Sequence, residues 1–520
     1  MDPLALPDLL ARSARRCPDF PAIEEPPAWS ISYRELDLLS DRVRDRLRAI
    51  GLARGDRVAI LARKSIDAVA ALLGAMKAGA ASVPIDPHAP AWRAAAILVG
   101  CSPRVAVAER ALATAVREEL ATLGAPQPRW LELAGTGGGM ALRARLDQED
   151  GIAPAPSAPA TVGLEDVAYI LHTSGSTGVS KGVVLSHCNI LSFVHWCSMA
   201  FDPRSDDRFS SHAPLHFDLS VLDLYLPLAH GATVVLIGPE ASREPVGLAA
   251  LIADRRITVW YSAPTALAML AEFGHLERHE FALRLVLFAG EVFPVKHLRA
   301  LVERIPGPRF FNLYGPTETN VCTAFEIPVP VPPERTAPYP IGQVCPHLRG
   351  RIIDSDGRDV PDGTEGELVI SGPNVMQGYW NMPDATARAF LADADGTRWY
   401  RTGDVVRREA PSADLVFLGR RDRMVKRRGH RIELGDVEAG LYRHPRVREA
   451  AVLARADQDA GIRLRAFLSF IDGPRPTIVE MKSFAAGALP AAMIPDEFVF
   501  LDTLPKSPTD KIDYLKLRES

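Results

Sequence analysis

The sequence carries no feature that would direct the protein to a membrane or to nucleic acid. Its net charge is only −4 over 520 residues, so electrostatics favours neither partner. The N-terminal segment contains Asp2 and Asp8 and has no apolar centre, which argues against a secretory signal peptide. The longest apolar stretch, 219–238, is interrupted by Asp223 and His230, which predicts a buried helix followed by a strand rather than a membrane span.

Cysteine is scarce, and the six cysteines are not spaced as metal ligands. They include no C-x-x-C pair and no zinc-site spacing, so we expect reduced thiols in a cytoplasmic protein. The sequence also lacks a repeat of about 20–50 residues, which argues against a solenoid or a propeller. Hydrophobic residues make up 47% and charged residues 24%, as in ordinary globular proteins, and the length requires two or more domains.

Short β-branched runs alternate with helical patterns through the N-terminal part. Residues 57–63 are predicted to form a strand, 65–80 an amphipathic helix and 81–86 the next strand. The same alternation returns further along the chain, at 232–238, 250–264 and 284–290. This order predicts an α/β fold in which helices cover mostly parallel sheets.

The pattern changes after about residue 350. D-G and G-T turns separate short strands there, which predicts a β-rich subdomain. The C-terminal part then shows helix, strand, strand and helix patterns in that order, which predicts a small α+β domain. Residues 134–166 are rich in Gly, Ala and Pro, and they are equally consistent with an interdomain linker and a surface loop.

A small polar loop at 173–181 follows a predicted buried strand. Gly175 and Gly178 allow the backbone to approach a ligand closely, and successive N–H groups in such a turn bind anions. Hydroxyl donors and one mobile positive charge complete a set that suits a polyphosphate, namely Thr173, Ser174, Ser176, Thr177 and Lys181. The alternative is a Ser/Gly surface loop. A P-loop kinase is disfavoured, because no Ser or Thr follows the lysine.

This loop resembles the phosphate loop of the adenylate-forming superfamily, which includes acyl-CoA synthetases, luciferases and nonribosomal peptide synthetase adenylation domains. Further stretches match that superfamily in the same order, namely ISYRELD, MKAGAASVPIDP, HFDLSVLD, NLYGPTE, GELVISGPNVMQGYW, YRTGD, GRRDRMVKRRGHRIELGDVE and PKSPTDKID. The resemblance implies a large adenylation domain over 1–421 and a small, mobile α+β domain over 422–520.

The resemblance implies that ATP and Mg²⁺ act together. A carboxylate attacks the α-phosphate of ATP, so cations and aimed donors must stabilise the gathering negative charge. Glu318 matches the magnesium ligand, and Lys511 matches the lysine that bridges the substrate carboxylate and the α-phosphate. Thr173 and Lys181 share the catalytic assignment. The implied ATP and AMP contacts are Thr173, Ser174, Gly175, Ser176, Thr177, Gly178, Lys181, Ala289, Gly290, Glu291, Asn312, Tyr314, Gly315, Thr317, Asp404, Arg420 and Lys511.

Asp218 indicates that the activated acid is an amino acid. In amino-acid-activating relatives an Asp at this place pairs with the α-ammonium, and a buried carboxylate needs such a cation. The remaining implied pocket positions are uncharged, namely Leu219, Leu222, Tyr261, Leu287, Ala289, Leu313, Val321 and Cys322. This set resembles that of stand-alone enzymes that activate L-proline. Apolarity alone would not separate proline from another small apolar amino acid.

The resemblance also implies a second step, in which a thiol attacks the adenylate. Asp422 matches the hinge and Gly429 the loop that reaches the thiol path after the small domain turns. Arg427, Arg428, His430 and Arg431 are either a basic edge near that path or, as we expect for each, a solvated face. We expect the acceptor to be the phosphopantetheine of a separate peptidyl carrier protein. Alternatives are an acyl- or aryl-CoA ligase and a non-catalytic binding module, and the intact motif residues disfavour the latter.

Overall fold

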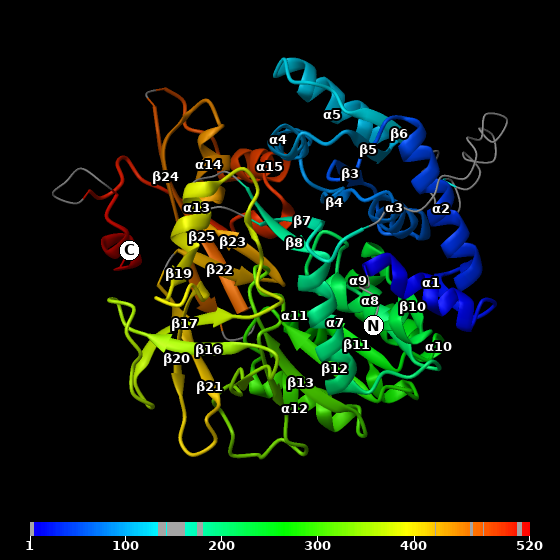
Figure 1. Ribbon diagram of the computed structural model, residues 1–520. Coiled ribbons are helices and arrows are strands. Elements are labelled where there is room, and N and C mark those ends of the chain that lie inside the picture. Colours follow the sequence, from blue (N-terminus) through cyan, green and yellow to red (C-terminus); the bar gives the residue numbers. More distant parts are fainter. Residues whose placement is uncertain are drawn as a thin grey trace.

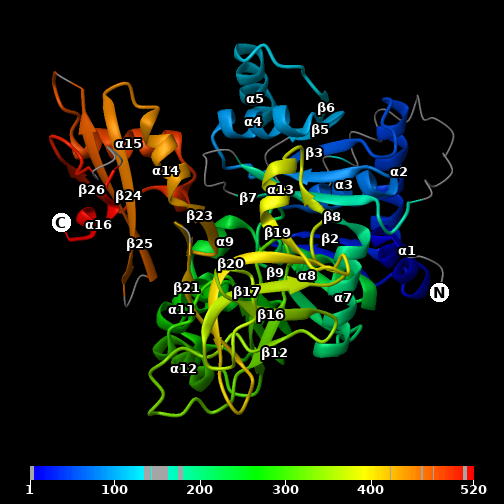
Figure 2. The same cartoon turned by 60° about the vertical axis from the view of Figure 1, so that its left-hand side comes forward.

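Two mostly parallel sheets form the centre of the larger part of the protein (Figure 1). The computed structural model describes residues 5–133, 142, 162–173, 180–421, 423–457, 461–471, 473–506 and 512–519. Within these residues the predicted α/β architecture is confirmed, with a β-rich region and a smaller C-terminal part. Figure 2 shows that C-terminal part, orange to red, to one side of the sheets.

The first sheet has nine described strands, and its central pairs are parallel. Alternate residues of its strands enter different cores, because successive side chains of a strand point to opposite faces. Tyr261 joins the core beneath helix α8 (Leu219–His230). Trp260 joins the core beneath helices α10 (Pro245–Asp254), α11 (Pro264–Phe273) and α12 (Val295–Arg304). Its strands, in spatial order, are β15 (Gln343–Val344), β14 (Thr323–Glu326), β13 (Arg309–Tyr314), β12 (Leu285–Ala289), β11 (Val259–Ser262), β9 (Arg208–Ser211), β10 (Thr233–Leu236), β1 (Pro21–Glu25) and β2 (Trp29–Ser32).

The second sheet is parallel from β7 to β6 and antiparallel at its other edge. Its described strands, in spatial order, are β18 (Gly378–Tyr379), β8 (Lys181–Ser186), β7 (Val167–Thr173), β4 (Ala81–Pro84), β3 (Arg57–Leu61), β5 (Val105–Glu109) and β6 (Arg129–Leu133).

The helices of the larger part are α1 (Leu6–Arg16), α2 (Tyr33–Ala49), α3 (Ile66–Lys77), α4 (Ala91–Cys101), α5 (Arg110–Thr122), α7 (His187–Phe201), α8 (Leu219–His230), α9 (Pro239–Arg243), α10 (Pro245–Asp254), α11 (Pro264–Phe273), α12 (Val295–Arg304) and α13 (Pro383–Ala389).

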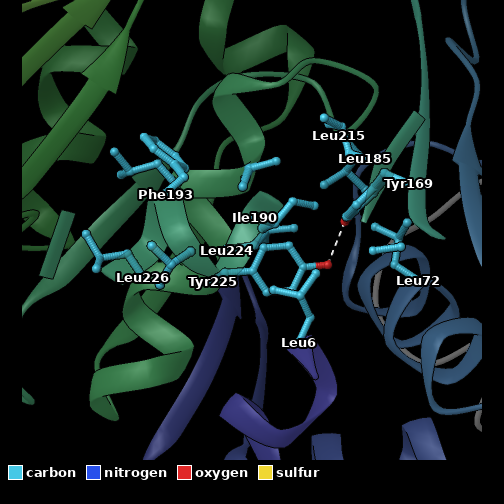
Figure 3. Packing of buried hydrophobic residues seen from close by; sticks show 14 of the residues in the cluster. Leu6, Leu72, Tyr169, Leu185, Ile190, Phe193, Leu215, Leu224, Tyr225 and Leu226 are labelled. Atoms are coloured by element: carbon cyan, nitrogen blue, oxygen red, sulfur yellow. Dashed lines mark hydrogen bonds between the residues drawn. The ribbon is translucent and has the colours of Figure 1, made fainter. Parts of the chain in front are cut away.

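One continuous core joins the two sheets (Figure 3). The hydroxyl groups of Tyr169 on β7 and Tyr225 on α8 are hydrogen-bonded at 2.7 Å inside it, so neither buried oxygen is left unsatisfied. Leu6 and Leu72 lie in the same cluster. The predicted helix and strand over 219–238 are α8 and β10, and both are almost entirely buried. Helix α8 is thereby fixed between the sheets.

The β-rich region predicted after residue 350 is a third, antiparallel sheet. It contains β16 (Arg349–Ile353), β17 (Glu365–Ser371), β19 (Phe390–Ala392), β20 (Arg398–Arg408) and β21 (Leu415–Arg420). The C-terminal part contains β22 (Met424–Arg427), β23 (His430–Glu433), α14 (Leu434–Tyr442), β24 (Val447–Asp457), β25 (Gly461–Phe470), α15 (Ile478–Ala488), β26 (Glu497–Phe500) and α16 (Tyr514–Glu519), with its own apolar core.

Candidate active site

The predicted apolar pocket residues come together where parallel strands β11, β12 and β13 end beside α8. Tyr261 and Leu287 are register partners, and so are Ala289 and Leu313. Carboxyl ends of parallel strands are where open α/β sheets bind ligands. Every predicted position belongs to or packs against one core cluster, namely Leu219, Leu222, Tyr261, Leu287, Ala289, Leu313, Val321 and Cys322. These positions therefore form a buried apolar cluster that contains one phenol.

Asp218 lies immediately before α8 and lines a cavity of about 130 Å³. Burial raises the pKa of its carboxyl group above the usual value, while a hydrogen bond from Thr317 and the charge of Lys426 oppose that rise. A carboxylate whose charge is only partly compensated attracts a further cation. The cavity can therefore hold the ammonium of a small molecule. Among the described residues, its lining does not include the predicted apolar positions, which lie in the neighbouring core.

Tyr314 and Asp404 are in direct contact at the junction between the first and third sheets. The Tyr314 hydroxyl donates a short hydrogen bond to Asp404, which is fully buried. Burial raises the pKa of Tyr314, so the phenol stays protonated and able to donate. Arg420 approaches the other Asp404 oxygen at 2.5 Å, as its register position opposite Asp404 requires. An aromatic face beside a carboxyl group suits a base stacked next to a sugar with two hydroxyls.

The turns around this contact are tight. Gly290 has φ +97, a conformation that favours glycine, and any Cβ on Gly315 would collide with a backbone carbonyl oxygen at 1.6 Å. Asn312 donates its side-chain amide to the Pro340 carbonyl at 2.8 Å. Glu291 accepts hydrogen bonds from the backbone N–H and hydroxyl of Thr265. These groups fix the backbone of the turn that the resemblance assigns to the adenine base.

Thr173 and Lys181 lie at facing ends of β7 and β8 as register partners. The rest of the predicted phosphate loop, Ser174 to Gly178, lies outside the described residues. The Ser180 hydroxyl donates to the Thr173 carbonyl at 2.9 Å, which ties the two strand ends together. The Lys181 ammonium stands 5.3 Å from the centre of the Tyr379 ring. A hydroxyl and a cation thus flank the position that the sequence assigns to phosphates.

Glu318, the predicted magnesium ligand, is completely buried. Tyr379 donates a hydrogen bond to its Oε1 at 2.7 Å, and Arg431 Nη1 lies 3.0 and 2.9 Å from its two oxygens. Burial opposes ionisation, but Arg431 and Tyr379 outweigh it and hold the pKa of Glu318 below its usual value. An ionised carboxylate is a ligand that Mg²⁺ accepts, with phosphates and water completing its coordination. The donor chemistry therefore fits the implied metal.

A two-stranded hairpin from the C-terminal part enters the same region. Strands β22 and β23 are joined by Arg428 and Gly429, which have φ +52 and +77, as a tight two-residue hairpin turn requires. The Gly429 N–H donates to Glu291 at 2.9 Å, and a Cβ at Gly429 would meet Ala263 at 3.0 Å. Gly429 also lines the cavity beside Asp218. The predicted loop thus lies within the site in this structure.

The expectation that each basic residue of this hairpin is a solvated face is wrong for Arg427 and Arg431. Arg427 is only 3% exposed and pairs with Asp496 at 2.6 Å, while Arg431 pairs with Glu318. His430 is half-buried and packs edge-on against Phe217 at 4.7 Å between ring centres. The outcome matches the expectation only for Arg428, which is exposed. Partners distant in the sequence explain the burial.

Sequence reasoning also missed Lys426 and Tyr379. The Lys426 ammonium lies 5.2 Å from the centre of the Tyr314 ring, and burial lowers its pKa, with Asp404 opposing that effect. Tyr379 bridges Lys181 and Glu318. For Lys426, one available signal was the alternation of side chains between the two faces of each hairpin strand. Lys426 is directly opposite Arg431 in the hairpin register.

Asp422 and Lys511, the predicted hinge and bridging lysine, lie outside the described residues. The neighbours of Lys511 lie at the outer side of the C-terminal part, where α16 packs beside β24 (Figure 2). Lys506 forms an ion pair with Glu449 on β24 at 2.5 Å, and an isolated bridge joins it to Ile512. The assignments of Asp422 and Lys511 therefore stay predictions.

Two global properties bear on the class of site. No helix in the described part of the chain is long and apolar enough to cross a bilayer. The described residues also contain no group of three or more His, Cys, Asp or Glu side chains placed to hold a metal ion. A metal at Glu318 would accordingly depend on phosphate oxygens and water for its remaining ligands.

Comparisons with known proteins agree with this geometry. Residues 10–380 match the AMP-binding enzyme family, and residues 436–511 match the AMP-binding enzyme C-terminal domain. An L-proline–[L-prolyl-carrier protein] ligase from Pseudomonas fluorescens is 40% identical over 94% of this chain and 94% of its own length. A ligase of the same name from Streptomyces coelicolor is 38% identical over 94% of this chain and 91% of its own length. The crystal structure of IdnL1 superposes with a TM-score of 0.78 at 30% identity, covering 97% of this chain and all of that one.

Proposed function

Because the chain belongs to the AMP-binding enzyme family, we propose that it activates L-proline with ATP and transfers the prolyl group to a carrier-protein thiol. The observation that carries this proposal is Asp218, which precedes α8 and whose charge acts on Tyr261 of the buried apolar cluster. The two relatives named as L-proline–[L-prolyl-carrier protein] ligases, similar over nearly their whole lengths, support the choice of amino acid and acceptor. We place the domain boundary between residues 421 and 422 and the protein in the cytoplasm.

In the first half-reaction the proline carboxylate displaces pyrophosphate from the α-phosphorus of ATP, which leaves prolyl-AMP. Asp218 pairs with the ring ammonium and orients the carboxylate. Tyr314 stacks on adenine, and Asp404 accepts hydrogen bonds from the ribose hydroxyls. Thr173 and Lys181 hold the leaving phosphates. Mg²⁺ held by Glu318 would neutralise phosphate charge. Lys511 would bridge the two reacting anions once the small domain brings it in.

In the second half-reaction a phosphopantetheine sulfur attacks the prolyl carbonyl carbon. The carbon–sulfur bond forms, the carbon–oxygen bond to phosphate breaks, the thiol proton is lost to solvent and AMP leaves. The cavity that Asp218 and Gly429 share is a path for this arm, since it lies between the large part and the hairpin. The hairpin contacts therefore suit the second half-reaction. The described neighbours of Lys511 lie beside β24, away from the cavity, which is consistent with the arrangement for the second half-reaction.

The test is the transfer of proline to a defined thiol. The purified protein is incubated with ATP, Mg²⁺ and L-proline, together with either a phosphopantetheinylated carrier protein or coenzyme A, and the acceptor mass is measured. A prolyl mass increase on the carrier, with none on coenzyme A, is the expected result. Loading of coenzyme A with an aryl or fatty acid would favour the acyl- or aryl-CoA ligase, and no adenylate with any acid would favour a binding module.

A further inference from the structure

Residues 212–218 connect strand β9 to helix α8 and end with Asp218. The last part of this segment is held on the first turn of α8. There the Ser220 hydroxyl donates to the carbonyls of Leu215 and Phe217 at 3.2 and 2.6 Å. The beginning of the segment is held differently, by a side chain that comes from the second sheet.

That side chain is Lys64, which lies between β3 and α3. Its ammonium donates to the carbonyls of Ser211, His212 and Ala213 at 2.5, 3.0 and 3.1 Å. An ammonium has three N–H donors, so three consecutive carbonyls use all of them. Lys64 therefore fixes the backbone at the point where it leaves β9, and it joins the first sheet to the second.

The backbone on both sides of Lys64 is itself fixed. The N–H and the guanidinium of Arg63 donate to Glu109 on β5 at distances of 2.9 to 3.0 Å. On the other side, Ser65 caps α3 and accepts a hydrogen bond from the Ala68 N–H at 3.2 Å. A side chain that starts from such an anchored turn can hold a neighbouring segment in one place.

Asp223 on α8 compensates the charge of Lys64. Asp223 is completely buried, and burial raises the pKa of its carboxyl group well above the usual value, while the charge of Lys64 opposes that rise. Burial lowers the pKa of Lys64 to about 7, and Asp223 opposes that fall. Each charge would be costly to bury without the other. Because α8 begins directly after Asp218, Lys64 acts on both ends of segment 212–218.

We propose that Lys64 is a positioning residue for Asp218, which clamps both ends of segment 212–218 and thereby fixes the carboxylate that receives the substrate ammonium. The inference rests on the proposed function for the role of Asp218. Lys64 is not among the described residues that line the cavity beside Asp218. It therefore acts through the segment and does not touch the substrate.

The first test is a double-mutant cycle in proline-dependent ATP–pyrophosphate exchange. Lys64→Met should raise the KM for L-proline about tenfold and leave the KM for ATP within about twofold, because it misplaces Asp218 and not the nucleotide contacts. In the Asp218→Asn background, the same substitution should raise the KM for proline less than about twofold, because the carboxylate to be positioned is gone. A tenfold rise in both backgrounds would show a general effect on the fold and would overturn the proposal.

Lys77→Met is the matched control. Lys77 ends the same helix, α3, and is half-buried like Lys64. Its ammonium donates to the Asp37 carbonyl at 3.0 Å and to the Asp41 carboxylate at 2.9 Å, which ties α3 to α2 and not to segment 212–218. Lys77→Met should therefore leave the KM for proline within about twofold of the wild-type value.

A milder pair of variants tests the compensation by Asp223. Lys64→Gln keeps N–H donors but removes the charge, so it should raise the KM for proline about threefold. Addition of Asp223→Asn removes the carboxylate that is left uncompensated, and it should recover part of that loss. A larger loss in the double variant would contradict the assigned link between the two charges. If Lys64→Met does not fold, as judged by urea denaturation, Lys64→Gln replaces it in the cycle.

The second test needs no substrate. Backbone hydrogen–deuterium exchange of peptides from residues 211–222 should become roughly tenfold faster in Lys64→Met, including the Phe217 N–H that donates to the Pro214 carbonyl, and should stay unchanged in Lys77→Met. Unchanged hydrogen exchange in Lys64→Met would overturn the clamp. If no amino acid is activated but hydrogen exchange responds, the proposed function fails while the clamp stands. If proline is activated with an unchanged KM in Lys64→Met, the positioning role fails while the function stands.

Discussion

Replacement of Asp218 by Asn removes the charge that the proposed function assigns to the substrate ammonium. The side chain keeps its shape and its place beside α8, so the change isolates the charge. Breaking a buried ion pair costs about 3–5 kcal/mol, and the lower end applies because Asp218 is half-buried and lines the cavity. About 3 kcal/mol corresponds to roughly a 150-fold fall in kcat/KM for L-proline, since each 1.36 kcal/mol is a factor of ten.

The assay is proline-dependent ATP–pyrophosphate exchange, with kcat and KM measured for proline at saturating ATP. The loss should fall mainly on the KM for proline, because the ammonium is bound alike in the ground and transition states. Asp202→Asn is the matched control, since Asp202 is 86% exposed and lies after α7, outside the site. Activity of Asp218→Asn within threefold of wild type would refute the assignment of Asp218 to the ammonium.

Three further variants test other parts of the account. Asp404→Asn should raise the KM for ATP about tenfold to a hundredfold, because the amide replaces a buried carboxyl group that accepts charged hydrogen bonds. An unchanged KM for ATP would contradict the ribose assignment. Gly429→Val should impair carrier loading far more than pyrophosphate exchange. The backbone at Gly429 has φ +77, and the Cβ of a valine there would meet Ala263 at 3.0 Å. Equal impairment of both reactions would contradict this role of the turn. Asp207→Asn should lower the free energy of unfolding by about 3 kcal/mol, measured by urea denaturation, because it breaks a buried pair with Arg284. Burial opposes ionisation of Asp207, but Arg284, the Arg204 N–H and the Thr258 hydroxyl together outweigh it and lower the pKa of the carboxyl group. This stability is therefore complete above the unfolded-state pKa and is lost as pH falls through the folded-state pKa. The Asp207→Asn variant should accordingly lose less stability on acidification.

The fold could be predicted because its signals are local, whereas the pocket positions rest on the resemblance to the adenylate-forming superfamily. Period-two alternation in β11 and β12 determines which side chains face α8, so Tyr261 and Leu287 fall on one side and Trp260 on the other. The helix and strand over 219–238 follow from an apolar run interrupted by polar residues. In these cases a short stretch of sequence contains the information.

The buried cations of the hairpin could not be predicted in the same way. Arg427 and Arg431 look like solvated charges because most arginines are exposed. Their burial depends on partners 69 and 113 positions away, Asp496 and Glu318, which no local pattern reveals. Tyr379 escaped notice for the same reason, since its hydroxyl meets Glu318 across 61 positions.

The measurement that tests the central claim most directly is amino-acid-dependent ATP–pyrophosphate exchange over the twenty common amino acids without a carrier protein. The account predicts strong exchange with L-proline and little with the others. Strong exchange with a different apolar amino acid would keep the adenylation chemistry and discard proline. No exchange with any of them, in a folded protein supplied with ATP and Mg²⁺, would contradict the assignment of the site to amino-acid activation.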